Sequence, residues 1–239
     1  MPVGELLEGT FAVPAFVDHN SNCVALGEAC LGDGSRYDHV VALLLRTGVS
    51  VGVVRHREII CQSSLGEGEL GHTTIRVNGA RCWCGARGCL EAYASGHALL
   101  QRVQSLARRD PTWPGVAVLP TGTQSFDPSA VCQLAKAGDE RAEAMLREMF
   151  RYLGTGVNTV ARLLAPDALV VHGSFAAAGD WLIEEVRGVM GAAIQHPARL
   201  PDIIVSGADA SIGAAGAALM AASLTINRVH RLTGPPRRR

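Results

Sequence analysis

The chain has 239 residues, which is enough for one large domain with a substantial buried core. Hydrophobic residues make up 48% of it, aromatic residues only 5%, and 27 residues are glycine. Such a composition is typical of α/β proteins with closely packed helices. The formal net charge is zero, which argues against a broad basic face that binds nucleic acid through its phosphates.

The ends of the chain and its apolar segments predict a cytoplasmic protein that does not enter a membrane. The first residues, "MPVGELLEG", lack the basic and then apolar run of a signal peptide. The apolar run from Val40 stops at Arg46, and "GAAGAALMAASL" is too short and too rich in small residues to span a bilayer. Residues 226–239 are basic, and we expect a disordered tail there, with a nucleic-acid contact as the alternative.

The first half of the chain alternates between extended and helical patterns. Branched apolar residues indicate strands, and apolar residues at three- and four-residue steps indicate helices. In chain order we expect a strand at 39–45, a hairpin at 51–54 and 58–61, a helical segment at 90–106, a loop at 110–128 and a short helix at 129–137.

The second half contains the longest helical pattern, from Asp139 to about Leu164, interrupted by Gly154 and Gly156, where a bend or a close helix contact is expected. Two strand, glycine turn and helix units follow, so the pattern predicts one sheet covered by helices. Ligands of such sheets bind at the carboxyl ends of strands. We therefore expect a pocket near His172, Gly173, Ser174 and Gly207.

Three of the seven cysteines lie within eight positions, in "RCWCGARGC". An odd cysteine count with such a cluster does not indicate a disulfide framework. Cys82, Cys84 and Cys89, with His72 upstream, make a complete thiolate and imidazole set for tetrahedral zinc. Four protein ligands leave no open position, so this zinc would be structural and would hold the loop in shape.

Two carboxylates flank this zinc set. Glu69 lies three residues before His72, and Glu91 lies two residues after Cys89. A zinc ion that anchors both ends of the segment would hold the two carboxylates near one another, which suits the several hydroxyl groups of a sugar. The alternative is that Glu91 caps the following helix through the helix dipole.

The stretch "GELGHTTIRVNGARCWCGARGCLEAYAS" resembles the signature of the ROK family of repressors, open reading frames and sugar kinases. The segments "VPAFVDHNSNCVALGEACLG", "LLAPDALVVHGS" and "IGAAGAALMA" extend the resemblance over nearly the whole chain. It implies an α/β, actin-like (ribonuclease H-like) fold with a truncated N-terminal lobe, and a dimer or tetramer. On this reading, residues 1–22 are the remnant of that lobe with the sugar-binding strand, residues 23–225 are the C-terminal lobe with its zinc loop at 69–91, and residues 226–239 are the tail.

The resemblance also implies roles for individual residues. The zinc ligands would be His72, Cys82, Cys84 and Cys89, and the sugar would contact His19, Asn20, Glu69, His72 and Glu91. A weaker nucleotide-side match falls on Thr47, Gly48 and Gly173.

Three departures from the kinase pattern argue against phosphoryl transfer. Asn20 stands where the family's kinases carry an aspartate base, and an amide cannot accept the proton of a sugar hydroxyl. Asp18 is a poor substitute, because neighbours in an extended segment point to opposite sides. Arg46 and Ser50 replace glycines that would let backbone approach phosphate, and the phosphate loop of the kinases has no counterpart.

The sequence therefore predicts a sugar-sensing ROK protein of the transcriptional-regulator type, without kinase activity, that does not itself contact DNA. Its effector would be a monosaccharide or an amino sugar. The alternative is an ATP- and Mg²⁺-dependent kinase of glucose, N-acetylglucosamine or N-acetylmannosamine. A third reading is a zinc-bearing structural or assembly protein that binds no ligand.

Overall fold

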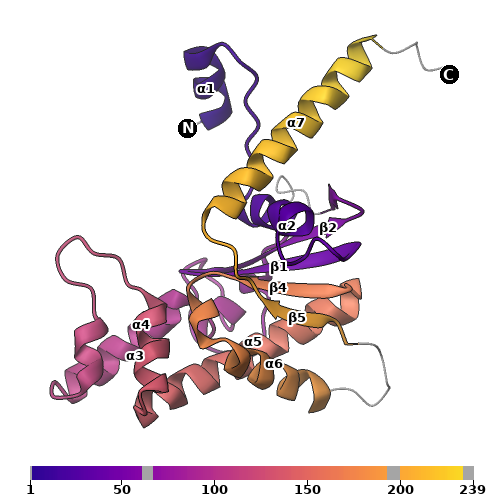
Figure 1. Cartoon of the computed structure of the whole chain (residues 1–239). Helices are drawn as coiled ribbons and strands as arrows, with labels where there is room; N and C mark the ends of the chain where they lie inside the picture. Colours follow the sequence, from indigo (N-terminus) through magenta and orange to yellow (C-terminus); the bar gives the residue numbers. More distant parts are fainter. Residues whose placement is uncertain (1, 61–66, 193–199, 234–239) are drawn as a thin grey trace.

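A five-stranded mixed sheet lies at the centre of the molecule, in the order β3-β2-β1-β4-β5 (Figure 1). The computed structural model describes residues 2–60, 67–192 and 200–233. The strands are β1 His39–Leu45, β2 Val49–Arg55, β3 Glu58–Ile59, β4 Ala168–His172 and β5 Asp202–Val205. The helices are α1 Val3–Phe11, α2 Asn20–Leu31, α3 Gly96–Arg109, α4 Pro128–Lys136, α5 Glu140–Leu164, α6 Asp180–Ala192 and α7 Ser211–Thr233. Short 3-10 turns are η2 Leu70–His72, η3 Leu90–Ala92, η4 Pro114–Val118 and η5 Ser174–Ala178.

The central strand β1 is buried along its whole length because both faces of the sheet are covered. It pairs antiparallel with β2, where Val41 lies opposite Val53, and parallel with β4, where Val41 lies beside Leu169. Val41, Leu43 and Leu45 join one core, and Val40, Ala42 and Leu44 join the other. This alternation follows from the two-residue period of a strand.

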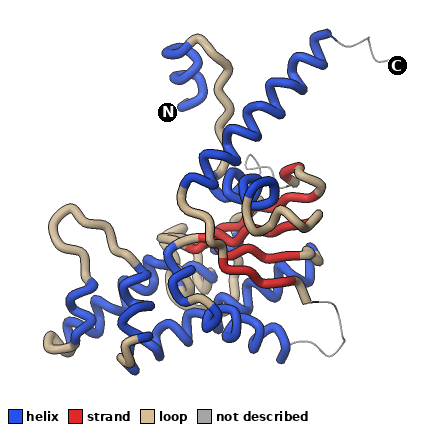
Figure 2. Tube along the Cα trace, viewed as in Figure 1, coloured by secondary structure: helices blue, strands red, loops and turns tan. Residues whose placement is uncertain are grey.

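Helices cover the two faces unequally (Figure 2). The larger core packs α3, α4, α5 and α6 against one face, and the smaller core packs α2 and α7 against the other. Helices α2 and α7 approach very closely: a Cβ atom on Gly216 would lie 1.8 Å from the carbonyl oxygen of Cys23. Glycine at this position therefore allows the backbone contact that holds α7 on α2.

The long helix α5 confirms the strongest helical pattern in the sequence. Its two glycines make close contacts: a Cβ on Gly154 would lie 2.8 Å from Val189 of α6, and one on Gly156 would lie 2.4 Å from Leu90. The helical segment expected from Leu90 begins later, as α3, because the Ser95 side chain accepts a hydrogen bond from the Ala98 N–H and caps the helix there.

Three expectations about the N- and C-terminal segments and the hairpin need correction. The structure has no strand within residues 2–22; an irregular segment links α1 to α2, so the predicted sugar strand is absent there. The helix α7 continues to Thr233, so residues 226–233 are helical and not disordered. Residues 234–239 lie outside the described part of the chain. Strand β3 ends at Ile59, and Cys61 lies outside the described residues. None of the helices in the described ranges is long and apolar enough to cross a membrane.

Candidate functional site

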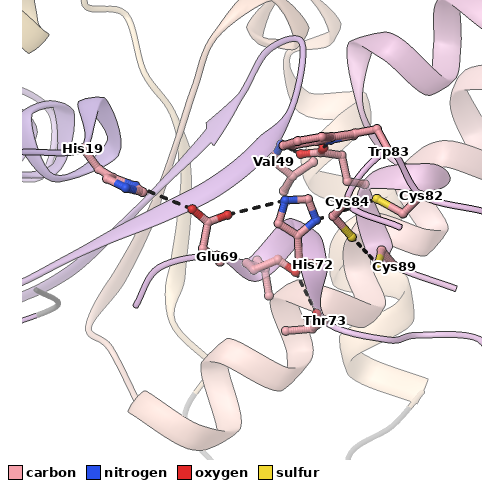
Figure 3. A network of polar contacts seen from close by, with 11 residues as sticks. His19, Val49, Glu69, His72, Thr73, Cys82, Trp83, Cys84 and Cys89 are labelled. Atoms are coloured by element: carbon pink, nitrogen blue, oxygen red, sulfur yellow. Dashed lines mark hydrogen bonds and ion pairs between the residues drawn. The ribbon is translucent and has the colours of Figure 1, made fainter. Parts of the chain in front are cut away.

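The three cysteines and the histidine predicted to bind metal lie together. The ligand atoms of His72, Cys82, Cys84 and Cys89 all lie within 4.8 Å of one another. Figure 3 shows the His72 ring facing the sulfur atoms. The Cys84 and Cys89 Sγ atoms are 3.8 Å apart, and Cys82 Sγ is 3.7 Å from His72 Nδ1. Two thiolates bound to one tetrahedral zinc at about 2.3 Å lie about 3.8 Å apart, so the donor set fits that ion.

The loop reaches this arrangement through two glycines with positive φ. Gly85 has φ +93° and Gly88 has φ +78°, values that other residues rarely adopt. A Cβ on Gly88 would also lie 1.8 Å from the Arg76 carbonyl oxygen. The Cys82 N–H donates to the Ala86 carbonyl at 2.8 Å and closes the turn. The chain can therefore bring Cys89 back toward Cys82 and Cys84 within a few residues.

The environments of the thiols differ. Burial, together with hydrogen bonding to the other two thiols, raises the pKa of Cys89 to about 12. A hydrogen bond with the backbone of Ala86 lowers the pKa of the exposed Cys84. Because metal binds thiolates, a bound cation must displace these protons, and metal affinity falls as the pH falls.

Glu69 bridges two imidazoles at the edge of this cluster. Its Oε1 lies 3.7 Å from His19 Nδ1, and its Oε2 lies 3.6 Å from His72 Nε2. The Nδ1 atom of His72 faces Cys82, so the two ring nitrogens of one side chain address the sulfur cluster and the carboxylate separately (Figure 3). The metal candidate and the sugar-site candidates are thus physically joined through His72.

Glu91 is buried and held at both carboxylate oxygens. Its Oε2 accepts a hydrogen bond of 2.8 Å from the Val49 N–H, and its Oε1 accepts one from the Trp83 indole N–H. Glycine surrounds Oε2: a Cβ on Gly48 would lie 2.6 Å away and one on Gly71 would lie 2.9 Å away. Both Glu91 oxygens thus have partners outside α3, and the side chain that caps α3 by a hydrogen bond is Ser95.

A cavity of about 640 Å³ brings most of the predicted ligand residues together. Its lining consists of Asn20, Leu44, Arg46, Thr47, Gly48, Val49, Ser50, Glu69, His72, Trp83, Cys84 and Glu91. His19 is outside this lining and reaches it through Glu69. Thr47 and Gly48, expected on the nucleotide side, line the same cavity as the carboxylates. Gly173 does not: it lies under the end of β1, where a Cβ would be 2.2 Å from the Leu45 carbonyl oxygen.

Asn20 is the first residue of α2, is exposed and lines this cavity. The nearby carboxylate of Asp18 is engaged elsewhere, because its Oδ1 accepts from the His19 N–H at 2.6 Å and from the Asn22 amide at 2.8 Å. Asp18 is also absent from the cavity lining. That Asp18 does not replace a base at position 20 stays a prediction.

A second polar cluster lies at the carboxyl ends of β4 and β5. His172 Nδ1 is 3.4 Å from Glu28 Oε1, and the Ser206 hydroxyl donates to the same oxygen. Burial raises the pKa of Glu28, but the hydrogen bonds from His172 and Ser206 outweigh burial and leave the pKa below its ordinary value. Of the residues expected near a pocket on this side, His172 and Gly207 belong to this cluster or border it, and neither lines the cavity of Asn20 and Glu91.

Trp83 is the site residue that the sequence analysis missed. It lies between two cysteines, is 73% exposed, and packs edge-on against the His72 ring with centroids 5.2 Å apart. The available signal was a large aromatic residue between two candidate metal ligands. Its hydrogen bond to Glu91 depends on the folded loop, and no residue spacing reveals it.

Comparisons with known proteins identify related chains. The profile of the ROK family matches residues 1–223. The xylose repressor of Caldicellulosiruptor bescii is 26% identical over 195 residues, which cover 80% of this chain and 47% of the repressor. The glucokinase of Streptomyces coelicolor is 29% identical over 188 residues, which cover 78% of this chain and 59% of the glucokinase. This chain thus spans about half the length of these curated relatives.

The fold is also similar to that of solved ROK family structures. The crystal structure of a ROK family glucokinase from Streptomyces griseus, in complex with glucose and AMPPNP, superposes with a TM-score of 0.77 at 26% identity. The superposition covers 92% of this chain and 72% of that one. The predicted actin-like α/β fold is confirmed. Repressors and kinases match to similar extents, so the comparisons support a domain common to both.

Proposed function

This chain belongs to the ROK family, and on that premise we propose that it is a carbohydrate-binding domain of the transcriptional-regulator type. It senses a monosaccharide or an amino sugar and leaves it unphosphorylated. The observation that carries this proposal is the position of Asn20, whose amide lines one cavity with Glu69, His72 and Glu91. An amide can bind a sugar hydroxyl but cannot take its proton.

The composition of the cavity supports a polyhydroxylated ligand. Two carboxylates supply acceptors, while the amide of Asn20 and the imidazole of His72 supply further polar groups. A volume of about 640 Å³ lies within the usual range of small-molecule sites. Charge-assisted hydrogen bonds to carboxylates are the stronger kind, so Glu69 and Glu91 should dominate the affinity.

A structural zinc ion at His72, Cys82, Cys84 and Cys89 belongs to the same proposal. Four ligands would complete its tetrahedral shell, so it would activate no water. Two of the candidate ligands lie next to the carboxylates: His72 faces Glu69, and Cys89 precedes η3, which carries Glu91. Fixing the loop would therefore fix the separation of the two carboxylates.

The second candidate function is an ATP- and Mg²⁺-dependent sugar kinase. It is favoured by the 29% identity to a glucokinase and by Thr47 and Gly48, which line the same cavity as the carboxylates. This candidate needs another group to accept the hydroxyl proton, and it needs phosphate contacts from elsewhere, including another subunit of a homo-oligomer. Asn20 carries no such base, and Asp18 lies outside the cavity lining.

The test is a thermal-shift titration of zinc-quantified protein with xylose, glucose, N-acetylglucosamine and N-acetylmannosamine, each with and without ATP and Mg²⁺. We expect one of the sugars to raise Tm, because a ligand that binds the folded state alone stabilises it. ATP should add nothing. The variant Glu69→Gln should lose the sugar shift, and Glu140→Gln, an exposed carboxylate on α5 away from the cavity, should keep it.

Each remaining outcome has a defined meaning. Stabilisation by both sugar and ATP would favour the kinase. Stabilisation by none of the four sugars would contradict the sensor proposal and leave the zinc-bearing structural protein as the better reading. A sugar shift that survives Glu69→Gln would remove Glu69 from the binding site.

A further inference from the structure

We propose that Trp83 covers Glu91 in the ligand-free protein and that a bound sugar displaces its indole N–H from the carboxylate. The inference rests on the proposed function, because it concerns how that same cavity takes its ligand. Trp83 would then be a residue that sets affinity by competing with the ligand, in addition to the side chains that contact the sugar.

The first step concerns which oxygen of Glu91 a ligand can reach. Oε2 accepts the Val49 N–H, and the backbones of Gly48 and Gly71 enclose it so closely that a single Cβ atom would collide with it. Oε1 is the other oxygen, and it accepts the Trp83 indole N–H. A sugar hydroxyl that approaches this oxygen from the side on which the indole lies takes the place of that N–H.

The second step concerns how firmly the indole is held. Trp83 is 73% exposed, so little packing restrains its ring. The ring donates a hydrogen bond to Glu91 and makes an edge-on contact with the His72 ring, at an interplanar angle of 71°. Its backbone, in contrast, lies between Cys82 and Cys84, two members of the metal-binding set. A fixed backbone with a weakly held ring allows the side chain to change rotamer without disturbing the loop.

The third step concerns the space around the ring. Trp83 and Glu91 both line the 640 Å³ cavity and a second cavity of about 310 Å³. His97 and Gln101 of α3 also line the second cavity. Rotation of the indole would therefore free space for the ligand beside the carboxylate oxygen.

If the indole competes with the ligand, its removal should tighten sugar binding, whereas removal of a residue that contacts the sugar would weaken it. Trp83→Phe keeps an aromatic ring but removes the N–H donor, so Glu91 Oε1 is left ready for the ligand. In this variant the ligand no longer has to break the hydrogen bond between the indole N–H and the charged Glu91 carboxylate. Sugar binding should therefore tighten by about tenfold. Trp83→Ala should also bind at least as tightly as the wild type, because the cover is removed entirely.

The experiment measures Kd for xylose and glucose by calorimetry on the wild type, Trp83→Phe, Trp83→Ala and Trp181→Phe, all at equal zinc content. Trp181 is the matched control, because it lies on α6 against Phe150, away from both cavities. Tryptophan emission is recorded in the same titrations. Trp113 is buried and bonded to Asp139, and Trp181→Phe removes the third tryptophan, so a ligand-dependent emission change that remains in Trp181→Phe and is absent from Trp83→Phe reports Trp83.

The expected result is tighter binding by Trp83→Phe, unchanged binding by Trp181→Phe, and an emission change in the wild type that is absent from Trp83→Phe. If the wild type binds a sugar but Trp83→Phe binds it equally or more weakly, the covering role is overturned while the proposed function stands. If no variant and no wild-type protein binds either sugar, and the wider panel also fails, the proposed function falls and this inference falls with it.

Discussion

The Glu91 carboxylate accepts a hydrogen bond from the backbone N–H of Val49 at 2.8 Å, and this contact ties the cysteine loop to the first residue of β2. Glu91→Ala would leave that buried N–H without its partner. We expect this variant to lose about 1–3 kcal/mol of unfolding free energy, measured by denaturant titration. It should also lose sugar-dependent stabilisation.

The variant Glu91→Gln separates the effect of Glu91 on stability from its effect on sugar binding. Glu91→Gln retains a carbonyl oxygen for the Val49 N–H but loses the negative charge, so most of the stability should remain while sugar affinity falls. Equal stability of wild type, Glu91→Gln and Glu91→Ala would show that the Val49 contact does not hold the loop.

Gly48 provides a test of the space around the same carboxylate. A Cβ at this position would lie 2.6 Å from Glu91 Oε2 and force the carboxylate aside. Gly48→Ala should therefore weaken sugar binding by about tenfold or more, since a charged hydrogen bond is misplaced. Calorimetry measures the change.

Gly188→Ala is the matched control, because nothing lies within 4 Å of its added Cβ. It should leave affinity unchanged and raise stability by up to about 1 kcal/mol, since alanine favours the helix α6. Wild-type affinity in Gly48→Ala would mean that Glu91 does not need its present position to bind sugar.

The metal centre predicts a loss of both stability and binding when one thiolate is removed. Cys84→Ser should reduce the zinc content well below one ion per chain and lower Tm by at least about 5 °C. Elemental analysis and thermal unfolding measure the two effects. Cys30→Ser, on α2 and outside the cluster, should keep the wild-type zinc content. Full sugar binding by metal-free protein would contradict the link between the ion and the carboxylates.

The Glu28 cluster predicts a defined dependence on pH. The pKa of Glu28 is lowered from its ordinary value of 4.5 by hydrogen bonds that outweigh burial. The folded state therefore binds fewer protons than the unfolded state as the pH falls below that value. The carboxylate contributes stability above pH 4.5, and this contribution is lost as the pH falls through the folded-state pKa.

Unfolding free energies of wild type and Glu28→Gln between pH 7 and pH 3 test this cluster. The variant should be less stable at pH 7 and should lose less stability on acidification. Glu140→Gln should follow the wild-type curve. Parallel curves for wild type and Glu28→Gln would show that Glu28 does not stabilise the fold through its charge.

Local patterns predicted much of the fold and of the metal cluster. The two-residue period of β1, the apolar stripe of α5 and the cysteine spacing each lie within a short window of sequence. The strand that the family resemblance implies within residues 1–22 is absent, because the segment before Asn20 pairs with none of the strands in the described part of the chain. The helical extension of α7 beyond residue 226 was missed because charge and proline suggested a tail.

The parts of the site that the sequence did not reveal are contacts between distant residues. The hydrogen bond from Val49 to Glu91 spans 42 residues, and no local pattern encodes it. The role of Trp83 depends on the direction of one side chain in a turn. Residue types thus indicated the chemistry of the cavity, whereas the pairing of its donors and acceptors required the folded chain.

Asn20 allows a test by gain of function. If the missing base were the only obstacle to catalysis, Asn20→Asp should create a sugar kinase. We expect at most a trace of ATP-dependent sugar phosphate, because phosphate contacts are also needed and Arg46 and Ser50 crowd the turn beside the cavity. High turnover by this variant would show that the chain possesses a working ATP site.

The most direct test of the central claim is to incubate zinc-quantified wild-type protein with ATP, Mg²⁺ and the sugar that raises its Tm most, and to follow the sugar by mass spectrometry. We expect the sugar to bind and to be recovered unchanged. Sugar phosphate that accumulates in proportion to protein, and that disappears with Glu91→Ala, would contradict the proposed sensor function and identify the chain as a kinase.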